Sequence, residues 1–309
     1  MNPVKILVSS ETDDKSGAVA IAAIPGVELV DYDPNQPTLT DRQREAEIFL
    51  PPFRGSDRPI RLLQGLPKLR MVQLLSAGVD EWENHVPGHV TFASARGAHA
   101  RPVSEWVVSA ILTQLRQWPT LIGFKESGVW AHRMFDADTL AGKKVLIVGA
   151  GAIGKAVAAR LEVFEATSTL VASTAREGVY SYTALPDLIH DHDIVVITAP
   201  LTETTRSMVN SDFLSTMHDG AILVNVGRGQ IVDTAALVVE LQSGRLRAAL
   251  DVTDPEPLPA GHPLWDCPGL IISPHSARTV PGTNLLCYGV AAEQIRTFIT
   301  GGIPSNIAR

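Results

Sequence analysis

Cysteine is scarce in this sequence: Cys267 and Cys287 are the only two among 309 residues, and they are far apart. So few cysteines exclude a disulfide framework, and the lack of a CxxC pair excludes the usual spacing of a zinc site. We therefore expect a reducing compartment, no structural disulfide and no metal.

Long apolar runs and an excess of positive charge are also missing. No apolar stretch approaches the roughly 18 residues of a membrane-spanning helix, and the apolar run in MNPVKILVSS is too short for a signal peptide. The 26 Lys and Arg are outnumbered by 33 Asp and Glu, which gives a formal net charge of −7. This balance argues against nucleic acid and membrane surfaces as partners. We expect a cytoplasmic protein with a small-molecule ligand.

What the chain has is alternating secondary structure. Hydrophobic residues make up 45% of it, and its length suits two domains. Short apolar runs that end in turn residues alternate with helical periodicity, which is typical of βαβ units and a parallel sheet. The first third predicts strands at residues 4–8, 27–32, 48–50, 71–75 and 90–93, then a helix from Pro102 to Leu115 that stops at Trp118-Pro119.

A second series begins at KKVLIVGAGAIG and predicts six strands, which match one complete doubly wound sheet. A last helix, residues 285–299, follows that sheet, so we expect the chain to return to the first domain. The fold class is therefore α/β: a Rossmann-type parallel sheet, residues 98–284, inserted into a second α/β domain made of residues 1–97 and 285–309. The six strands are expected at residues 145–148, 169–172, 194–198, 222–226, 248–252 and 270–272.

The glycine-rich loop between the first strand and helix of this series reads GxGxxG. Gly149 allows a tight turn, Gly151 lets the backbone approach a pyrophosphate, and Gly154 allows close helix packing. The pyrophosphate would lie at the positive end of the helix. A purely structural turn is the alternative.

The end of the next strand bears on the choice between NAD and NADP. NAD enzymes place a carboxylate there for the ribose 2′-hydroxyl, but this chain reads LVASTARE, with Ser173, Thr174 and Arg176 in its place. Hydroxyls and a guanidinium can bind a 2′-phosphate, so NADP is favoured over NAD. Alternatively, Arg176 is a solvated residue that stacks on adenine and makes no choice between the cofactors.

Three residues capable of acid–base or anion-binding chemistry follow three successive strands: Arg228 in VNVGRGQIVD, Glu256 in ALDVTDPEPLP and His275 in IISPHSA. Ligands of open α/β sheets bind beyond the carboxyl ends of the strands, where these residues can converge. Singly, the arginine would be a surface ion-pair partner, the glutamate a solvated loop charge and the histidine structural. Together, behind a GxGxxG loop, they indicate an active site.

The order GxGxxG, APLTETT, NVGRGQIVD, ALDVTDPEPLP, HPLW and SPHSA resembles the D-isomer-specific 2-hydroxyacid dehydrogenase family over most of residues 60–300. That family includes glyoxylate/hydroxypyruvate reductases and phosphoglycerate dehydrogenases. The resemblance implies that the first domain is flavodoxin-like and binds substrate, and that the protein is a homodimer. Because no residues follow Arg309, the effector domain appended to some relatives is expected to be absent.

The resemblance also implies catalytic roles. Arg228 would bind the carboxylate and carbonyl oxygen of a 2-oxo acid, His275 would be the acid/base, and Glu256 would pair with His275. The chemistry agrees, because a guanidinium fork matches a carboxylate and a neighbouring carboxylate favours the protonated imidazole.

Substrate and cofactor contacts follow by the same resemblance. With Arg228 and His275, the substrate would meet the main-chain N–H groups of Ala77, Gly78 and Val79, unless that loop is an ordinary turn. Asp251 would accept a hydrogen bond from the nicotinamide carboxamide, since an unpartnered carboxylate at a strand end is costly. The expected cofactor-binding residues are Gly149, Gly151, Ala152, Ile153, Gly154, Ser173, Thr174, Arg176, Ala199, Pro200, Thr205, Val226, Gly227, Asp251 and Ala277.

Four further basic side chains lie outside these motifs: Arg54, Arg96, His99 and Arg101. They either bind a second anionic group on the substrate or are solvated. Taken together, the sequence predicts an oxidoreductase that transfers hydride between NADPH or NADH and a small 2-oxo acid such as glyoxylate or hydroxypyruvate. Two alternatives are a corepressor-like protein of the same fold that senses dinucleotide with little turnover, and an alanine dehydrogenase type, which would lack the Arg–Glu–His order.

Overall fold

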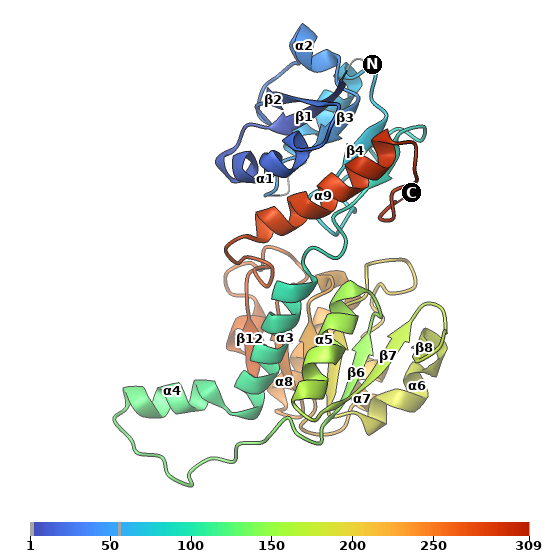
Figure 1. The fold of residues 1–309 in the computed structure, drawn as a ribbon. Coiled ribbons are helices and arrows are strands. Elements are labelled where there is room, and N and C mark those ends of the chain that lie inside the picture. Colours follow the sequence, from blue (N-terminus) through green and yellow to red (C-terminus); the bar gives the residue numbers. More distant parts are fainter. Residues whose placement is uncertain (1–2, 55–56, 309) are drawn as a thin grey trace. The chain divides into compact units, whose positions relative to one another are not determined.

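The computed structural model describes residues 3–54 and 57–308, and the chain divides into two compact units, drawn as a ribbon in Figure 1. Unit 1 combines the residues up to His99 with those from Val280 onward, and unit 2 runs from Ala100 to Thr279. The domain boundaries predicted from the sequence, at residues 97–98 and 284–285, lie a few residues from these positions.

Unit 1 is built on a five-stranded parallel sheet with the order β2-β1-β3-β4-β5, which is the flavodoxin-like order. The strands are apolar on both faces because both faces are covered. Ile6 and Val8 of β1 pack on the side of α1 and α9, whereas Leu7 packs on the other side with Trp82. The elements are β1 Val4–Ser9, α1 Thr12–Ala22, β2 Val27–Tyr32, α2 Asp41–Arg44, β3 Ile48–Leu50, η1 Arg58–Gly65, β4 Met71–Gln73, β5 Thr91–Ala93 and α9 Thr283–Ile299.

The last helix, α9, packs against α1 at the other end of the sequence (Figure 1). The ring of Tyr288 lies directly over Gly17, where an added Cβ would be 2.0 Å from Cδ2 of the ring. The Tyr288 hydroxyl donates to Oδ1 of Asp14 at 2.9 Å. Asp14 is itself fully buried, and this burial raises the pKa of its carboxyl. The C-terminal segment thus completes the core of unit 1.

Unit 2 contains a seven-stranded parallel sheet with the order β12-β11-β10-β9-β6-β7-β8. Helices α3 and α5 cover one face and α7 and α8 the other (Figure 1), so the predicted α/β fold class is confirmed. The main elements are α3 Ala100–Leu115, α4 Trp118–Glu126, β6 Lys144–Val148, α5 Ala152–Val163, β7 Thr167–Ala172, β8 Val179–Ser181, α6 Leu185–Leu188, β9 Ile194–Ile197, α7 Ser211–Thr216, β10 Ile222–Asn225, α8 Thr234–Gln242, β11 Arg247–Leu250 and β12 Leu270–Ile272.

The prediction of six strands in this sheet was wrong by one. The additional strand, β8, has only three residues and pairs with β7 at the edge of the sheet. So short a segment has no periodicity to distinguish it from a loop. Its pairing with β7 is therefore visible only in the tertiary structure.

A second difference is α4, which begins where the sequence predicted only the end of α3. Pro119 lies in its first turn, where a proline is well tolerated, and none of its residues is buried. Figure 1 shows α4 and the segment after it extending away from the rest of unit 2. In that segment Trp130 is 91% exposed and Met134 61%. We call residues 118–134 the arm.

The packing of Tyr288 on Gly17 gives a stability test. Gly17→Ala should lower the free energy of unfolding by about 1–3 kcal/mol, because the methyl group overlaps a fully buried ring. Gly289→Ala, in the middle of α9 with nothing within 4 Å of the added Cβ, is the matched control. It should raise stability by about 0.5–1 kcal/mol through helix propensity. Urea unfolding of both variants measures this, and equal effects would contradict the packing.

Candidate active site

Arg228, Glu256 and His275 follow three adjacent strands of the unit 2 sheet, β10, β11 and β12. Parallel strands place their carboxyl ends at one edge, so these residues share that edge with the GxGxxG loop, which follows β6. The loops after β10 and β11 also touch: a Cβ on Gly229 would lie 1.9 Å from the main-chain oxygen of Thr253.

His275 and Glu256 are in direct contact, as the sequence predicted. Nδ1 of His275 lies 2.6 Å from Oε1 of Glu256, and their side chains are 41% and 38% exposed. The pair is thus accessible to a ligand. His275 has a φ of 51°, in the left-handed region that residues other than glycine rarely adopt, and such backbone persists only where the surroundings hold it.

Asp251 holds this backbone in place. Its Oδ1 accepts hydrogen bonds from the Ser273 hydroxyl at 2.5 Å, the Ser276 N–H at 2.8 Å and the Ala277 N–H at 3.0 Å. Its main-chain oxygen accepts from the His275 N–H at 2.7 Å. Asp251 is 4% exposed, so these donors supply the partners that a buried carboxylate requires. The sequence predicted a cofactor contact for Asp251 but missed this second role.

Arg228 lies in a turn that a neighbouring amide organises. The buried Asn225 side chain accepts the Gly227 N–H at 3.0 Å and donates to the Arg228 main-chain oxygen at 3.0 Å. Nη1 of Arg228 donates to the Gly227 oxygen at 2.8 Å, and the residue is half-buried. Sequence reasoning missed Asn225. The sequence feature that could have identified Asn225 is its polar amide at the end of a strand whose other residues are apolar.

The GxGxxG loop has the shape that a dinucleotide requires. Gly149 has a φ of +120°, and a Cβ on Gly154 would lie 1.9 Å from the Gly149 oxygen, so no other residue fits at either position. Gly151 faces open space, with nothing within 4 Å of an added Cβ. It is also the N-cap of α5, and it provides no side-chain hydrogen bond to the first turn. Backbone N–H groups at such a helix end suit a pyrophosphate.

The loop after β7 approaches this glycine loop through Arg176. Its Nη2 donates to the Ala150 main-chain oxygen at 3.0 Å, and its Nη1 lies 3.4 Å from the Thr174 oxygen. Ser173 and Thr174 are exposed. The guanidinium therefore lies beside the loop that would hold the pyrophosphate.

Other predicted cofactor residues shape the loops at this edge. Ala199 and Val226 are buried at strand ends. The hydroxyl of Thr205 donates to the Pro200 oxygen at 2.7 Å and accepts from the Thr202 N–H at 2.8 Å, so Thr205 supports the loop from within. The Ala277 N–H is taken by Asp251, as described above.

The remaining predicted residues belong to unit 1. Ala77, Gly78 and Val79 follow β4 and are partly exposed, and the Ser76 hydroxyl donates to the Gly78 oxygen at 2.7 Å. For His99 the alternative of a solvated side chain was wrong: the residue is 5% exposed, and its Nε2 lies 3.0 Å from the buried Cys287 sulfur.

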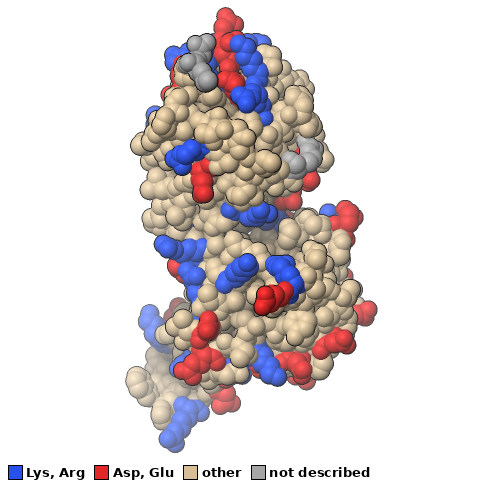
Figure 2. Space-filling model, turned by 45° about the vertical axis from the view of Figure 1, so that its right-hand side comes forward, with Lys and Arg blue, Asp and Glu red and all other residues tan. Residues whose placement is uncertain are grey.

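The other basic residues differ from His99. Arg101 is exposed, and Nη2 of the exposed Arg96 donates to the Ser305 oxygen at 3.3 Å. On the face drawn in Figure 2, basic and acidic side chains are interspersed rather than gathered into a basic stripe. Across residues 3–54 and 57–308, no group of three or more His, Cys, Asp or Glu is arranged to bind a metal, and no helix could cross a membrane.

Known proteins share both the sequence and the fold. The glyoxylate reductase of Aeropyrum pernix is 32% identical over 298 residues, covering 89% of this chain and 88% of that protein. Glyoxylate/hydroxypyruvate reductase B of Serratia proteamaculans is 30% identical over 257 residues, covering 79% of each. A D-isomer specific 2-hydroxyacid dehydrogenase of Xanthobacter autotrophicus, solved in complex with NADPH and MES, superposes with a TM-score of 0.80 at 27% identity, covering 99% of this chain and 98% of that one.

A family model points to the same conclusion. Residues 108–277, more than half of the chain, match the NAD-binding domain of the D-isomer specific 2-hydroxyacid dehydrogenases. This range lies within unit 2 and contains the glycine loop, Arg228, Glu256 and His275. The chain therefore belongs to the D-isomer specific 2-hydroxyacid dehydrogenase family and is an NAD(P)-dependent oxidoreductase that reduces 2-oxo acids.

Proposed function

We propose that the protein is an NADPH-preferring reductase of small 2-oxo acids such as glyoxylate or hydroxypyruvate. The observation that carries the proposal is the His275–Glu256 contact of 2.6 Å, on the same sheet edge as Arg228 and the uncapped glycine loop. Two relatives, at 32% and 30% identity, are named glyoxylate reductase and glyoxylate/hydroxypyruvate reductase, which supports the substrate class.

The residues divide the reaction between them. NADPH supplies the hydride when it is bound. Arg228 binds the carboxylate and the keto oxygen of the substrate, and it orients the carbonyl carbon and stabilises the negative charge that develops on oxygen. The main-chain N–H groups of Ala77, Gly78 and Val79 are further proposed donors to the substrate carboxylate.

His275 delivers the proton. Because Glu256 is bonded to Nδ1, Nε2 is the nitrogen that donates a proton to the developing alkoxide. Glu256, in contact with Nδ1, fixes the orientation of the ring. Asp251, through its bonds to the 273–277 loop, keeps the imidazole aligned, and it accepts a hydrogen bond from the nicotinamide carboxamide.

The preference for NADPH follows from the end of β7. An acidic residue there would repel a 2′-phosphate, and Ala172 occupies that strand end. Arg176, held beside the glycine loop through Ala150, provides the compensating positive charge, and the hydroxyls of Ser173 and Thr174 donate hydrogen bonds. The neighbour from Xanthobacter autotrophicus was solved with NADPH.

The proposed enzyme is a cytoplasmic homodimer, and the arm of unit 2 forms its interface. A hollow of about 570 Å³ between α3, α4 and α5 is lined by apolar side chains that include Leu112, Trp118 and Phe164. Trp130 and Met134 of the arm are 91% and 61% exposed. A protrusion and a hollow on one unit suit a two-fold interface, in which each copy covers the other.

The exposed apolar area is sufficient for such a dimer. With large side chains each offering on the order of 150–200 Å², the exposed fractions of these side chains amount to roughly 700 Å², close to the ~800 Å² per partner of a stable interface. The side chains counted are Trp118 52%, Ile122 50%, Val129 42%, Trp130 91%, Met134 61%, Val163 82% and Phe164 41%.

Removing the imidazole tests the acid/base role. His275→Ala should lower kcat for glyoxylate reduction by about 10²–10⁴-fold, while NADPH binding, followed by fluorescence titration, survives. His190→Ala, an exposed histidine elsewhere on unit 2, should leave both unchanged. Near-normal turnover in His275→Ala would refute the role. A wild-type protein that binds NADPH but oxidises it with no 2-oxo acid would instead favour the dinucleotide-sensing alternative.

A charge change at the end of β7 tests the cofactor preference. Ala172→Asp should shift the ratio of kcat/KM for NADPH over NADH toward NADH by about tenfold or more, because the carboxylate repels the 2′-phosphate. The uncharged isostere Ala172→Asn should retain the wild-type ratio. Steady-state kinetics with both reduced cofactors measures it, and equal ratios in all three proteins would rule out this basis for NADPH selection.

Charging the arm tests the dimer. Trp130→Glu should weaken self-association by about tenfold or more, because it places a charge in an apolar contact. Val239→Glu alters another exposed apolar residue of unit 2, on α8 and 65% exposed, and should leave association unchanged. Sedimentation velocity over a concentration series gives both values. A wild-type monomer, or a dimer insensitive to Trp130→Glu, would contradict the proposed interface.

A further inference from the structure

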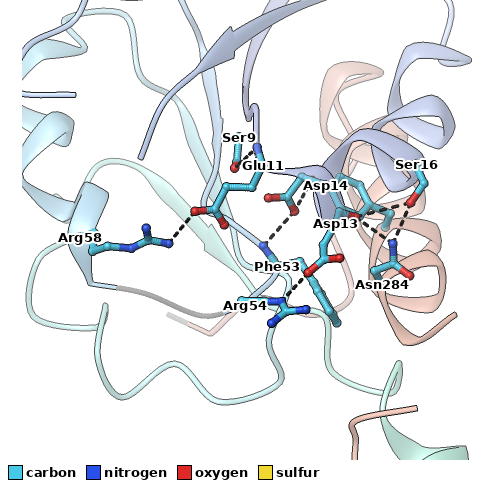
Figure 3. A network of polar contacts seen from close by, with 10 residues as sticks. Ser9, Glu11, Asp13, Asp14, Ser16, Phe53, Arg54, Arg58 and Asn284 are labelled. Carbon is cyan, nitrogen blue, oxygen red and sulfur yellow. Dashed lines mark hydrogen bonds and ion pairs between the residues drawn. The ribbon is translucent and has the colours of Figure 1, made fainter. Parts of the chain in front are cut away.

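Unit 1 carries a polar network that the proposed mechanism does not use, at the carboxyl edge of its sheet (Figure 3). The first turn of α1, which follows β1, supplies Asp13 and Asp14, and the loop after β3 supplies Phe53 and Arg54. Asp13 forms an ion pair with Nε of Arg54. Asp14 accepts the Phe53 N–H on Oδ1 at 2.9 Å.

Both partners of this ion pair are attached to the core of unit 1. The Asp14–Phe53 bond fixes the residue directly before Arg54, and Asp14 is fully buried. On the other side, the Asn284 side-chain amide of α9 donates to the Asp13 main-chain oxygen at 2.8 Å and to the Ser16 hydroxyl at 2.8 Å. The Arg54 side chain is 75% exposed, but its guanidinium is held next to a carboxylate. An exposed ion pair adds little stability by itself. The hydrogen bonds that fix both of its partners therefore suggest a role other than stability.

The position of the pair relative to the proposed substrate loop provides one. Strands β1, β3 and β4 are consecutive in the sheet. Asp13, Arg54 and Ala77 each lie four residues beyond the ends of these strands, which are Ser9, Leu50 and Gln73. With neighbouring strands about 5 Å apart, the segments that follow these three strands span about 10 Å along one edge. A 2-oxo acid bound by Ala77–Val79 would therefore lie on the sheet edge that also carries Arg54.

The charge at this edge does not favour a second anion. A second ion pair joins Nη2 of Arg58 to Oε1 of Glu11 at 2.9 Å. Each of the two guanidinium groups thus faces a carboxylate, and Asp14 is a third acidic residue in the segment that follows β1. An anion arriving beside Arg54 would have to compete with Asp13 and would meet its repulsion.

We propose that the Asp13–Arg54 pair is a specificity device, in which Asp13 neutralises Arg54 and so restricts the enzyme to 2-oxo acids whose far end carries no negative charge. This inference rests on the proposed function and names its substrate class more narrowly. It also predicts that loss of Asp13 turns Arg54 into a binding site for a second carboxylate.

The test compares 2-oxoglutarate with 2-oxopentanoate, which have the same number of carbons and differ by a terminal carboxylate. In the wild-type protein, kcat/KM with NADPH should be about tenfold or more lower for the dianion. Asp13→Asn, which keeps the shape and the main-chain oxygen that binds Asn284, should raise the ratio of 2-oxoglutarate to 2-oxopentanoate by on the order of tenfold. The rise should appear mainly as a lower KM for 2-oxoglutarate, because the gain is in binding.

Two further variants separate this effect from a general disturbance. Adding Arg54→Gln to Asp13→Asn should return the ratio to the wild-type value, since the cation that binds the second carboxylate is gone. Glu28→Gln breaks the exposed Glu28–Arg42 ion pair elsewhere on unit 1 and should not change the ratio. Thermal unfolding confirms that each variant is folded.

An unchanged ratio in folded Asp13→Asn, with glyoxylate still reduced, would overturn this inference alone. A rise that persists in the double variant would also overturn it, because Arg54 would not be the group responsible. Failure of the wild-type protein to oxidise NADPH with glyoxylate or any other 2-oxo acid would overturn the proposed function, and this inference with it.

Discussion

The hydrogen bonds that Asp251 accepts are the constraint on which the rest of the active site depends. One oxygen of its carboxylate binds a hydroxyl and two successive main-chain N–H groups, and its main-chain oxygen binds the N–H of His275. Together they hold the left-handed backbone at His275. Without them the imidazole would have no fixed position opposite Glu256, because an isolated residue in this conformation is unfavourable.

The parallel sheet of unit 2 brings the residues of the candidate site to one edge. Its central strands are buried on both faces and leave their carboxyl ends at one edge, so residues from distant motifs meet there without any contact between the motifs in the sequence. Glycines then allow the loops to approach each other. Gly227 and Gly229 lie so close to the main-chain oxygens of Ala199 and Thr253 that no side chain would fit. The positions of Arg228 and Glu256 follow from these close approaches.

Unit 1 also contains a parallel sheet, but the edge of this sheet carries different groups. Its sheet edge carries acidic and basic side chains in pairs, and buried anchors such as Asp14 and Tyr288 connect this edge to the first and last helices. In the proposed function unit 2 supplies the proton donor and the dinucleotide loop, whereas the paired charges on unit 1 are proposed to select the substrate.

The sequence by itself predicted the α/β class, which the structure confirms. It also predicted the return of the chain to the first domain and the candidate site residues Arg228, Glu256 and His275. These features depend on local periodicity and on residue types whose chemistry is independent of neighbours. Only the tertiary structure decided the pairing of β8, the exposed arm, the role of Asn225, the burial of His99 and the Asp13–Arg54 pair. Each of these depends on which groups come into contact in the folded chain, and such contacts leave no periodic signal in the sequence.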